Sequence, residues 1–269
     1  MSFSPDLQFD VQRDINPRNL YRPINNATWT TLVGGKVSVL KDNGRGTARD
    51  LTQSTDANRP VHGTDSRGNE FMDHGSGETW MDAATKADWT WSHDPPEGSG
   101  VTVASIVKLD SVSATQNIIA DTSDTSGTNG WRIIVNGSFG SGFSVYRTTG
   151  YAVSCQAGTN NNGPTGIYVV VARWRELDDD SQGADPENRV SARYRVNGVE
   201  LIVNQPRQST YTGNEPLIPL RVGSSSAATT GLTGKLYELA IDDRWWSDDL
   251  VARYEQRAIT EFGADKMIL

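Results

Sequence analysis

Cysteine is nearly absent from this sequence, since Cys155 is the single one among 269 residues. One cysteine excludes an internal disulfide, a cysteine-based metal cluster and a redox pair. The chain also lacks any run of about 18 apolar residues, the length that spans a bilayer. Its first residues have neither the basic nor the apolar segment of a signal peptide. Together these absences indicate a protein made in a cytoplasm, or assembled there into a larger structure.

Basic residues are in deficit as well. The chain has 25 lysines and arginines against 33 aspartates and glutamates, which gives a formal net charge of −8 at pH 7. Nucleic acids and anionic membrane surfaces repel such a chain. We therefore expect no nucleic-acid partner and no membrane insertion, and we attribute the charge to solubility.

Short alternating segments separated by glycine- and asparagine-rich turns dominate the sequence and predict antiparallel strands. The sharpest signal is Asn197-Gly198 between two alternating runs, because Asn-Gly favours the type I′ turn of a hairpin. Many short strands with a single helix at the end point to a β-sandwich. Besides the hairpin arms, we expect strands in the segments 35–42, 101–109, 116–121, 131–136, 143–147, 151–156 and 167–175.

The last part of the chain predicts a strand followed by the only helix. Residues 236–242 alternate with a period of two, as in a strand with one buried side. Ser247 is a good N-cap, and an amphipathic stripe follows it up to Gly263, where the helix should end.

The start of the chain is less regular. The alternation in residues 7–11 predicts an edge strand, and the proline- and asparagine-rich residues 16–26 predict an ordered loop. We expect residues 1–26 to form an N-terminal arm or edge segment that serves as a docking element. Residues 27–269 should form one β-sandwich domain, because no internal repeat or linker interrupts them.

An ordered set of segments resembles a known superfamily. In this order, NGRGTARDLTQSTDANRP, NEFMDHGSGETWMD, VTVASIVKL, NGWRIIVNGS, LRVGSSS and the stretch from LTGKLYELAIDD to ITEFG resemble concanavalin A-like lectins and glucanases, in their laminin-G-like bacterial and phage form. Asp242 and Phe262-Gly263 take the places of that form's strand-ending aspartate and final aromatic-glycine pair. The resemblance implies an all-β, antiparallel jelly-roll sandwich with one C-terminal α-helix.

This superfamily contains sugar binders, hydrolases, adhesion modules and virion proteins, so function has to be argued from sites. The glucanase branch carries alternating carboxylates on one strand, and the nearest segment here runs from Glu238 to Asp242. Ala240 stands where the central acid would be, which removes the paired acid and nucleophile that glycoside hydrolysis needs. We therefore predict no catalytic residues and interpret this strand face as solvated.

Neither the histidines nor the cysteine suggest another catalytic group. His62, His74 and His93 lie in loop-like sequence, which predicts surface histidines. Cys155 lies in a strand pattern, where a small buried side chain is the more common role.

Calcium is the metal that the sequence would best accommodate, although no cofactor is required. The acidic loop 176–188 begins like an EF-hand, but Gln182 and Arg189 occupy positions that need ligands. A different geometry could recruit the three aspartates of this loop, and an exposed acidic loop is the alternative. The candidate ligands are Asp178, Asp180 and Asp185.

Glycan binding needs a flat aromatic face with polar groups around it. One region with that mixture lies along neighbouring expected strands and the asparagine loop after them, and packing within the sheet is the alternative. A second region is Arg244-Trp245-Trp246, where the alternative is a staple between helix and sheet. The candidates of the first region are Trp131, Arg132, Tyr146, Arg147, Tyr151 and Asn161.

These observations favour a non-catalytic structural or attachment protein of a phage virion, as a capsid decoration or tail component. It would be made in the host cytoplasm, lie on the virion surface, contact other virion proteins or copies of itself, and bind host cell-surface glycans. A chain that starts at Met1 without an export signal or an appended catalytic domain supports this expectation. The alternative is a free bacterial carbohydrate-binding protein or glycoside hydrolase, secreted without a recognisable signal peptide.

Overall fold

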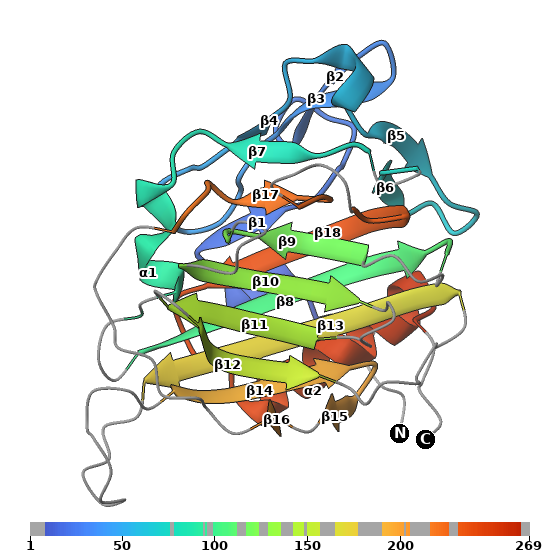
Figure 1. Ribbon diagram of the computed structural model, residues 1–269. Coiled ribbons are helices and arrows are strands. Elements are labelled where there is room, and N and C mark those ends of the chain that lie inside the picture. Colours follow the sequence, from blue (N-terminus) through green and yellow to red (C-terminus); the bar gives the residue numbers. More distant parts are fainter. Residues whose placement is uncertain are drawn as a thin grey trace, which may run out of the picture.

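The computed structural model describes residues 9–75, 78–93, 95, 99–111, 117–123, 129–135, 142–147, 150–156, 165–176, 190–201, 203–204, 216–225 and 231–264. Their strands form two antiparallel sheets packed face to face. The C-terminal helix packs on the outer face of one of these sheets (Figure 1). The expected all-β jelly-roll sandwich with a C-terminal helix is thereby confirmed.

The sheet nearer the helix, the back sheet, has β8 at its centre, with β18 on one side and β13 on the other. Every pairing in it is antiparallel. In spatial order its strands are β1 (Asn19–Tyr21), β18 (Gly234–Asp242), β8 (Gly100–Leu109), β13 (Gly166–Glu176), β14 (Val190–Val196) and β15 (Val199–Leu201).

The other sheet, the front sheet, lies across the back sheet in Figure 1 and its strands follow one another down the picture. Its pairings are also antiparallel throughout. In spatial order its strands are β4 (Leu51–Thr52), β7 (Met81–Ala83), β17 (Arg221–Val222), β9 (Asn117–Asp121), β10 (Gly130–Val135), β11 (Gly142–Arg147), β12 (Gly150–Gln156) and β16 (Val203–Asn204).

Four further strands join the two sheets at one end of the sandwich. β3 pairs with β2, β4 and β5, and β5 pairs with β6, which reaches β18. These strands are β2 (Thr30–Val33), β3 (Lys36–Leu40), β5 (Val61–Thr64) and β6 (Glu70–Asp73). The helical segments are η1 (Val11–Ile15), η2 (Asp56–Asn58), η3 (Ala87–Trp89), α1 (Thr90–His93), α2 (Asp248–Arg257) and η6 (Ala258–Phe262).

Local sequence signals placed most of these elements correctly. Each of the seven segments expected as strands contains one. The Asn-Gly hairpin is also present: Val196 pairs with Val199, and Asn197 and Gly198 have φ angles of 49° and 84°. Both central residues of a type I′ turn need positive φ, which asparagine and glycine tolerate.

The C-terminal helix begins and ends as the sequence predicts. The Ser247 side chain accepts a hydrogen bond from the Leu250 backbone N–H, and Gly263 ends the last turn in the left-handed conformation. Val251, Tyr254 and the other residues of the apolar stripe pack on the outer face of the back sheet. The helix thus covers the face of that sheet that does not contact the front sheet.

The strand before the helix differs from the expectation of one buried side. A bulge at Tyr237 interrupts the alternation of β18, so that Leu236 faces the front sheet while Tyr237 and Ala240 face the helix side. Both faces of β18 are buried, because the front sheet covers one face and α2 covers the other. The prediction was wrong because period-two hydrophobicity does not show what covers the second face.

The sequence predicts an edge strand at residues 7–11, but residues 9–11, the part of it that the structure describes, do not form a strand. Asp10 instead caps a helical turn, accepting a hydrogen bond from the Arg13 backbone N–H at 2.9 Å. Val11 and Ile15, four residues apart, are buried together with Leu20 in the cluster that also contains α2. The described residues 9–26 therefore pack against the back sheet and its helix, with β1 inside the segment expected to be a loop.

The space between the sheets holds a cluster of aromatic rings. Phe143 stacks on Trp174 with ring centroids 5.2 Å apart, and Trp131 lies 5.8 Å from Trp174. The short helix α1 contacts this aromatic cluster through Ser92. There Ser92 Oγ accepts a hydrogen bond from Trp131 Nε1 at 2.8 Å, and its carbonyl oxygen accepts one from Trp174 Nε1 at 2.9 Å.

Replacing Ser92 should therefore destabilise the sandwich core. In Ser92→Ala the Trp131 indole N–H loses its acceptor inside the core, and an unpaired buried donor costs about 1–3 kcal/mol. We expect the free energy of unfolding, measured by urea denaturation, to fall by about that amount. Ser105→Ala is the matched control, because Ser105 Oγ donates to the Glu238 backbone carbonyl and its loss leaves no orphaned donor. Equal losses in the two variants would contradict this account.

Candidate functional site

A row of mostly polar residues crosses the front sheet from edge to edge. Its members are partners in the strand register, one on each strand, and register partners share one face of a sheet. Four residues that alternate with members of the row lie in the core between the sheets, namely Met81, Val222, Trp131 and Val145. Asp82, Arg221, Arg132 and Ser144 are therefore on the outer face. In order its members are Thr52, Asp82, Arg221, Asp121, Arg132, Ser144, Ser154 and Asn204.

Near one end of the row, Trp80, Asp82 and Arg221 form what we name the Trp80 cluster. Arg221 donates two hydrogen bonds to the Asp82 carboxylate, from Nε at 2.7 Å and from Nη2 at 2.9 Å. Its guanidinium lies 4.9 Å from the centre of the Trp80 ring, and Trp80 Nε1 donates to Asp82 Oδ2 at 3.0 Å. All three side chains are half-buried, so part of each remains accessible from outside.

The middle of the row is buried. Arg132 donates to Asp121 Oδ2 from Nε at 2.9 Å and from Nη2 at 2.8 Å, and Ser123 donates to Asp121 Oδ1. Burial raises the pKa of Asp121 above its ordinary range, while Arg132 and Ser123 act in the opposite direction. This pair anchors the row beneath the surface and leaves the Trp80 cluster as its accessible charged part.

Chemically, the Trp80 cluster offers an aromatic ring beside a hydrogen-bond donor and a hydrogen-bond acceptor. An arginine–carboxylate pair is geometrically rigid because it is bidentate. A sugar ring presents an apolar face and hydroxyl groups that both donate and accept, which matches such a surface. Asp82 and Asp121 are each held by an arginine.

Two residues predicted for glycan binding are placed by the structure in different roles. Trp131 is fully buried in the core, so neither face of its ring can stack on a sugar, and the alternative of sheet packing applies to it. The prediction failed at this residue because strand alternation does not reveal which face meets the second sheet. Arg132 belongs to the polar row, but it is paired with Asp121 and nearly buried.

The other predicted glycan ligands are placed only in part. Tyr146 is the register partner of both Gly130 and Tyr151, and Arg147 is the partner of Gly150. β10, β11 and β12 are thus adjacent, as the prediction requires, although only the backbone of these tyrosines and of Arg147 is described. Asn161 lies outside the described residues.

The calcium ligands Asp178, Asp180 and Asp185 also fall outside the described part, and calcium binding stays a prediction. Within the described ranges, no group of three or more histidine, cysteine, aspartate or glutamate side chains is placed to hold a metal ion.

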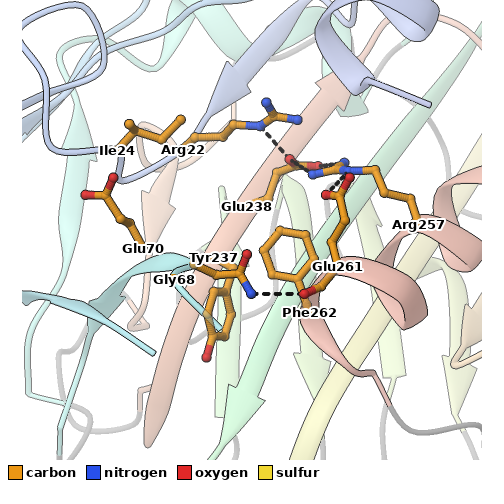
Figure 2. A pocket seen from close by; sticks show the side chains of 10 residues that line it. Arg22, Ile24, Gly68, Glu70, Tyr237, Glu238, Arg257, Glu261 and Phe262 are labelled. Atoms are coloured by element: carbon orange, nitrogen blue, oxygen red, sulfur yellow. Dashed lines mark hydrogen bonds and ion pairs between the residues drawn. The ribbon is translucent and has the colours of Figure 1, made fainter. Parts of the chain in front are cut away.

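The acids of the β18 segment are not on a solvated face, contrary to the sequence interpretation. Glu238 is fully buried and accepts from Arg22 and from Arg257, as Figure 2 shows. Burial by itself would raise the pKa of Glu238, but Arg257 and Arg22 lower it to about 2. Asp242 is buried as well and accepts hydrogen bonds from Arg244 and from Trp246 Nε1.

One histidine, His74, is not at the surface, where the sequence predicts all three histidines to lie. His74 is fully buried, and its ring packs so closely on Gly223 that no side chain would fit there. His62 is half-buried, with Nε2 2.8 Å from a carboxylate oxygen of Glu70. Only the backbone of His93 is described, so its predicted surface position stays a prediction. Cys155 pairs through its backbone with Phe143 and Val203, and its side chain lies outside the description.

The second tryptophan region is divided between core and surface. Trp246 is buried and packs against Tyr254 of α2, as a staple between helix and sheet would. Trp245 is half-buried, and the guanidinium groups of Arg173 and Arg175 lie 4.9 and 4.8 Å from its ring centre. Arg173 also pairs with Asp248 of α2, which puts Trp245 on the helix side of the molecule.

Sequence reasoning missed the Trp80 cluster. Trp80 immediately precedes β7 and Asp82 lies on it, but Arg221 lies 139 residues from Asp82 in the chain. β17 is only two residues long, so it offered no alternation that would reveal its neighbour. No local signal could have joined these three residues.

No protein-family model and no curated protein sequence matches the chain. Solved structures do resemble it. Botulinum neurotoxin type C, which interacts with two ganglioside molecules, aligns with a TM-score of 0.56 and 10% identity over 91% of this chain. A Trypanosoma rangeli sialidase in complex with 2,3-difluorosialic acid aligns with a TM-score of 0.51 and 11% identity over 93% of this chain. An arabinofuranosidase complexed with arabinofuranosyl-alpha-1,2-xylobiose aligns with a TM-score of 0.51 and 13% identity over 91% of this chain.

The chain spans 52%, 33% and 59% of those three chains, respectively. At such identities the likeness concerns the fold alone, and that fold is a lectin-like β-sandwich. Among the described residues, no helix is long and apolar enough to cross a membrane.

The buried His74 next to the row should make stability depend on pH. Burial lowers the pKa of His74 to about 4, from an ordinary value of 6.5. Between these pH values the unfolded chain binds a proton that the folded protein does not, so the free energy of unfolding falls as the pH drops from 6.5 to 4. This histidine should contribute at most about 3 kcal/mol to that fall.

Urea denaturation at pH 7, 5.5 and 4 measures this loss. His74→Asn removes the titrating ring, so its stability should change less over the same window, whatever its stability at pH 7. Parallel pH profiles for the wild type and this variant would rule out the assignment to His74.

Proposed function

We propose that this protein is a non-catalytic carbohydrate-binding protein that attaches to glycans through the Trp80 cluster. The carrying observation is the half-buried Trp80 ring beside the bidentate Asp82–Arg221 pair on the outer face of the front sheet. This combination of apolar ring, donor and acceptor suits a sugar. The pair is held rigidly before binding, which lowers the entropy cost of association.

The electrostatics of the cluster favour neutral glycans. The charges of Asp82 and Arg221 cancel, as do those of Asp121 and Arg132 next to them in the row. The chain as a whole carries a formal charge of −8, which disfavours acidic sugars such as sialic acid. The proposed ligand is therefore a neutral oligosaccharide, and its affinity should depend little on salt.

The absence of catalysis is part of the proposal. Four acids are candidates for a catalytic role, either from the sequence or from the fold, and each is paired with at least one arginine. They are Asp82, Asp121, Glu238 and Asp242. A hydrolase would need two carboxylates facing one glycosidic bond with separated pKa values.

The setting proposed for this binding is the surface of a phage particle. Its support is the resemblance of the ordered sequence segments to the phage form of the laminin-G-like sandwiches. Co-sedimentation of the protein with particles checks the setting, and a protein that sediments only as a free monomer would contradict it.

Trp80→Ala should weaken binding to a neutral oligosaccharide selected on a glycan array by at least about tenfold, which corresponds to about 1.4 kcal/mol. Isothermal titration calorimetry measures the change. Trp245→Ala is the matched control, because Trp245 is also a half-buried tryptophan stacked by arginine, but lies on the helix side. It should leave the affinity unchanged. If Trp245→Ala weakened binding and Trp80→Ala did not, the glycan site would instead lie at Arg244-Trp245-Trp246.

The bound oligosaccharide should remain intact. Incubation with the wild-type protein is expected to release no reducing sugar above background over hours. Release that Asp82→Asn or Asp121→Asn abolishes would show a hydrolase and overturn the non-catalytic part of the proposal.

A further inference from the structure

His74 lies between the two segments of chain that carry the Trp80 cluster, and its side chain is fully buried. On one side its ring Nδ1 donates a hydrogen bond to the Thr79 backbone carbonyl at 3.0 Å, and Thr79 immediately precedes Trp80. On the other side the ring packs on Gly223, which follows Arg221 by two residues and comes directly after β17. One imidazole ring therefore contacts both segments of the cluster.

The contact with Gly223 depends on its being a glycine. Gly223 has a φ angle of 92°, in the left-handed region, and the imidazole ring occupies the space where a side chain would begin. The strands β7 and β17, which Gly223 follows, pair directly with each other (Figure 1). Because packed interiors transmit small displacements, a shift of the ring would change how Trp80 lies against the Asp82–Arg221 pair.

The ring can keep this position only while it is neutral. Nδ1 carries the proton, because the Thr79 carbonyl can only accept a hydrogen bond. Nε2 is buried and has no hydrogen-bond partner within the protein. A second proton at Nε2 would create a buried charged donor without an acceptor, which is costly. Burial accordingly lowers the pKa of His74 to about 4.

Charged groups on the surrounding elements do not offset this cost where the ring now lies. Asp73 favours the protonated ring, but burial has the larger effect on the pKa. Arg221 is neutralised by its carboxylate partner, and Lys235 Nζ lies 4.7 Å from the centre of the Phe71 ring. The described charged groups on the elements around His74 are Asp73 on β6, Glu78 in the turn after β6, Asp82 on β7, Arg221 on β17 and Lys235 on β18.

A pocket of about 350 Å³ borders His74 and would suit the protonated ring better. Asp73 and Glu78 are among its lining residues, which include no lysine or arginine, and Glu78 is exposed. Nearby carboxylates and contact with water both favour an imidazolium ion. A protonated ring would therefore gain by turning from the buried position toward this pocket.

We propose that His74 is the positioning residue of the glycan surface, and that its protonation switches this surface off. The inference rests on the function proposed for the Trp80 cluster. The neutral ring holds the two segments in the arrangement that sets Trp80 against the Asp82–Arg221 pair. The protonated ring turns toward the pocket, and the cluster loses its support while the core of the sandwich stays folded.

Glycan affinity between pH 7 and pH 3.5, measured by isothermal titration calorimetry with the oligosaccharide selected on the array, tests the proposal. Only the protein with neutral His74 is competent to bind, so affinity is lost as the pH falls through the pKa of about 4. The Kd should stay constant down to about pH 5, double at about pH 4 and rise about fourfold at about pH 3.5.

Variants of His74 separate positioning from titration of other groups. His74→Ala should weaken binding at pH 7 by about tenfold or more. His74→Asn keeps a donor for the Thr79 carbonyl, so it should restore most of that loss without the dependence on pH. Any titration of Asp82 itself remains in this variant. His62→Asn is the matched control, because His62 is half-buried on β5 beside Glu70, and it should keep the wild-type profile.

Fluorine NMR of protein labelled with 5-fluorotryptophan reports on Trp80 without any ligand. The Trp80 resonance, assigned through Trp80→Phe, should shift with a midpoint near pH 4, while the resonances of the core tryptophans keep their positions. In His74→Asn the Trp80 resonance should not shift over this range. The wild-type spectrum decides the question even if a variant of His74 does not fold.

Two outcomes would overturn the inference. One is an equal dependence of glycan affinity on pH in the wild type and in His74→Asn. The other is a Trp80 resonance that moves only together with those of the core tryptophans, since that pattern reports unfolding of the whole domain. If no glycan binds, or if Trp80→Ala leaves binding intact, the proposed function fails instead, and the fluorine spectra still show whether His74 controls Trp80.

Discussion

Burial of the back sheet on both faces is the constraint on which this structure depends. β8 pairs along its length with β13 and β18, and side chains from one face of these strands fill the core against the front sheet. The other face packs against α2 and the residues around Val11 and Ile15. A sheet covered twice cannot leave polar groups to water, so each polar side chain on it needs a partner within the protein.

That requirement explains the ion pairs on the helix side. Glu238 lies on a central strand under α2, and two arginines from opposite ends of the chain neutralise it. Removing one partner of a buried pair is usually costly, because the remaining charge stays buried. Through Arg22 and Arg257 the same pairs tie the N-terminal segment and α2 to β18, so both are held by one set of contacts.

The helix α2 does not cover the front sheet, yet the middle of the outer face of this sheet is buried at Asp121 and Arg132. Its inner face contributes rings such as Trp131 and Phe143 to the core, while its outer face carries the polar row. Tryptophans turned inward, such as Trp131, pack in the core, whereas Trp80 is half-buried.

The sequence alone determined the elements whose signals are local. Alternation located the strands, Asn197-Gly198 specified the hairpin turn, and Ser247 and Gly263 marked the ends of the helical segment. These features depend on neighbouring residues only, because backbone conformation and capping act over a few positions.

Only the tertiary structure decided which faces are buried and which charges meet. It turned Trp131 inward, buried Glu238 and His74, and brought Arg221 to Asp82 and Arg22 to Glu238 across 139 and 216 residues of chain. The hydrophobic alternation of a strand has a period of two whether a second layer of structure or water covers a given face of the sheet. Sites assembled from distant strands therefore leave no mark in any one stretch of the sequence.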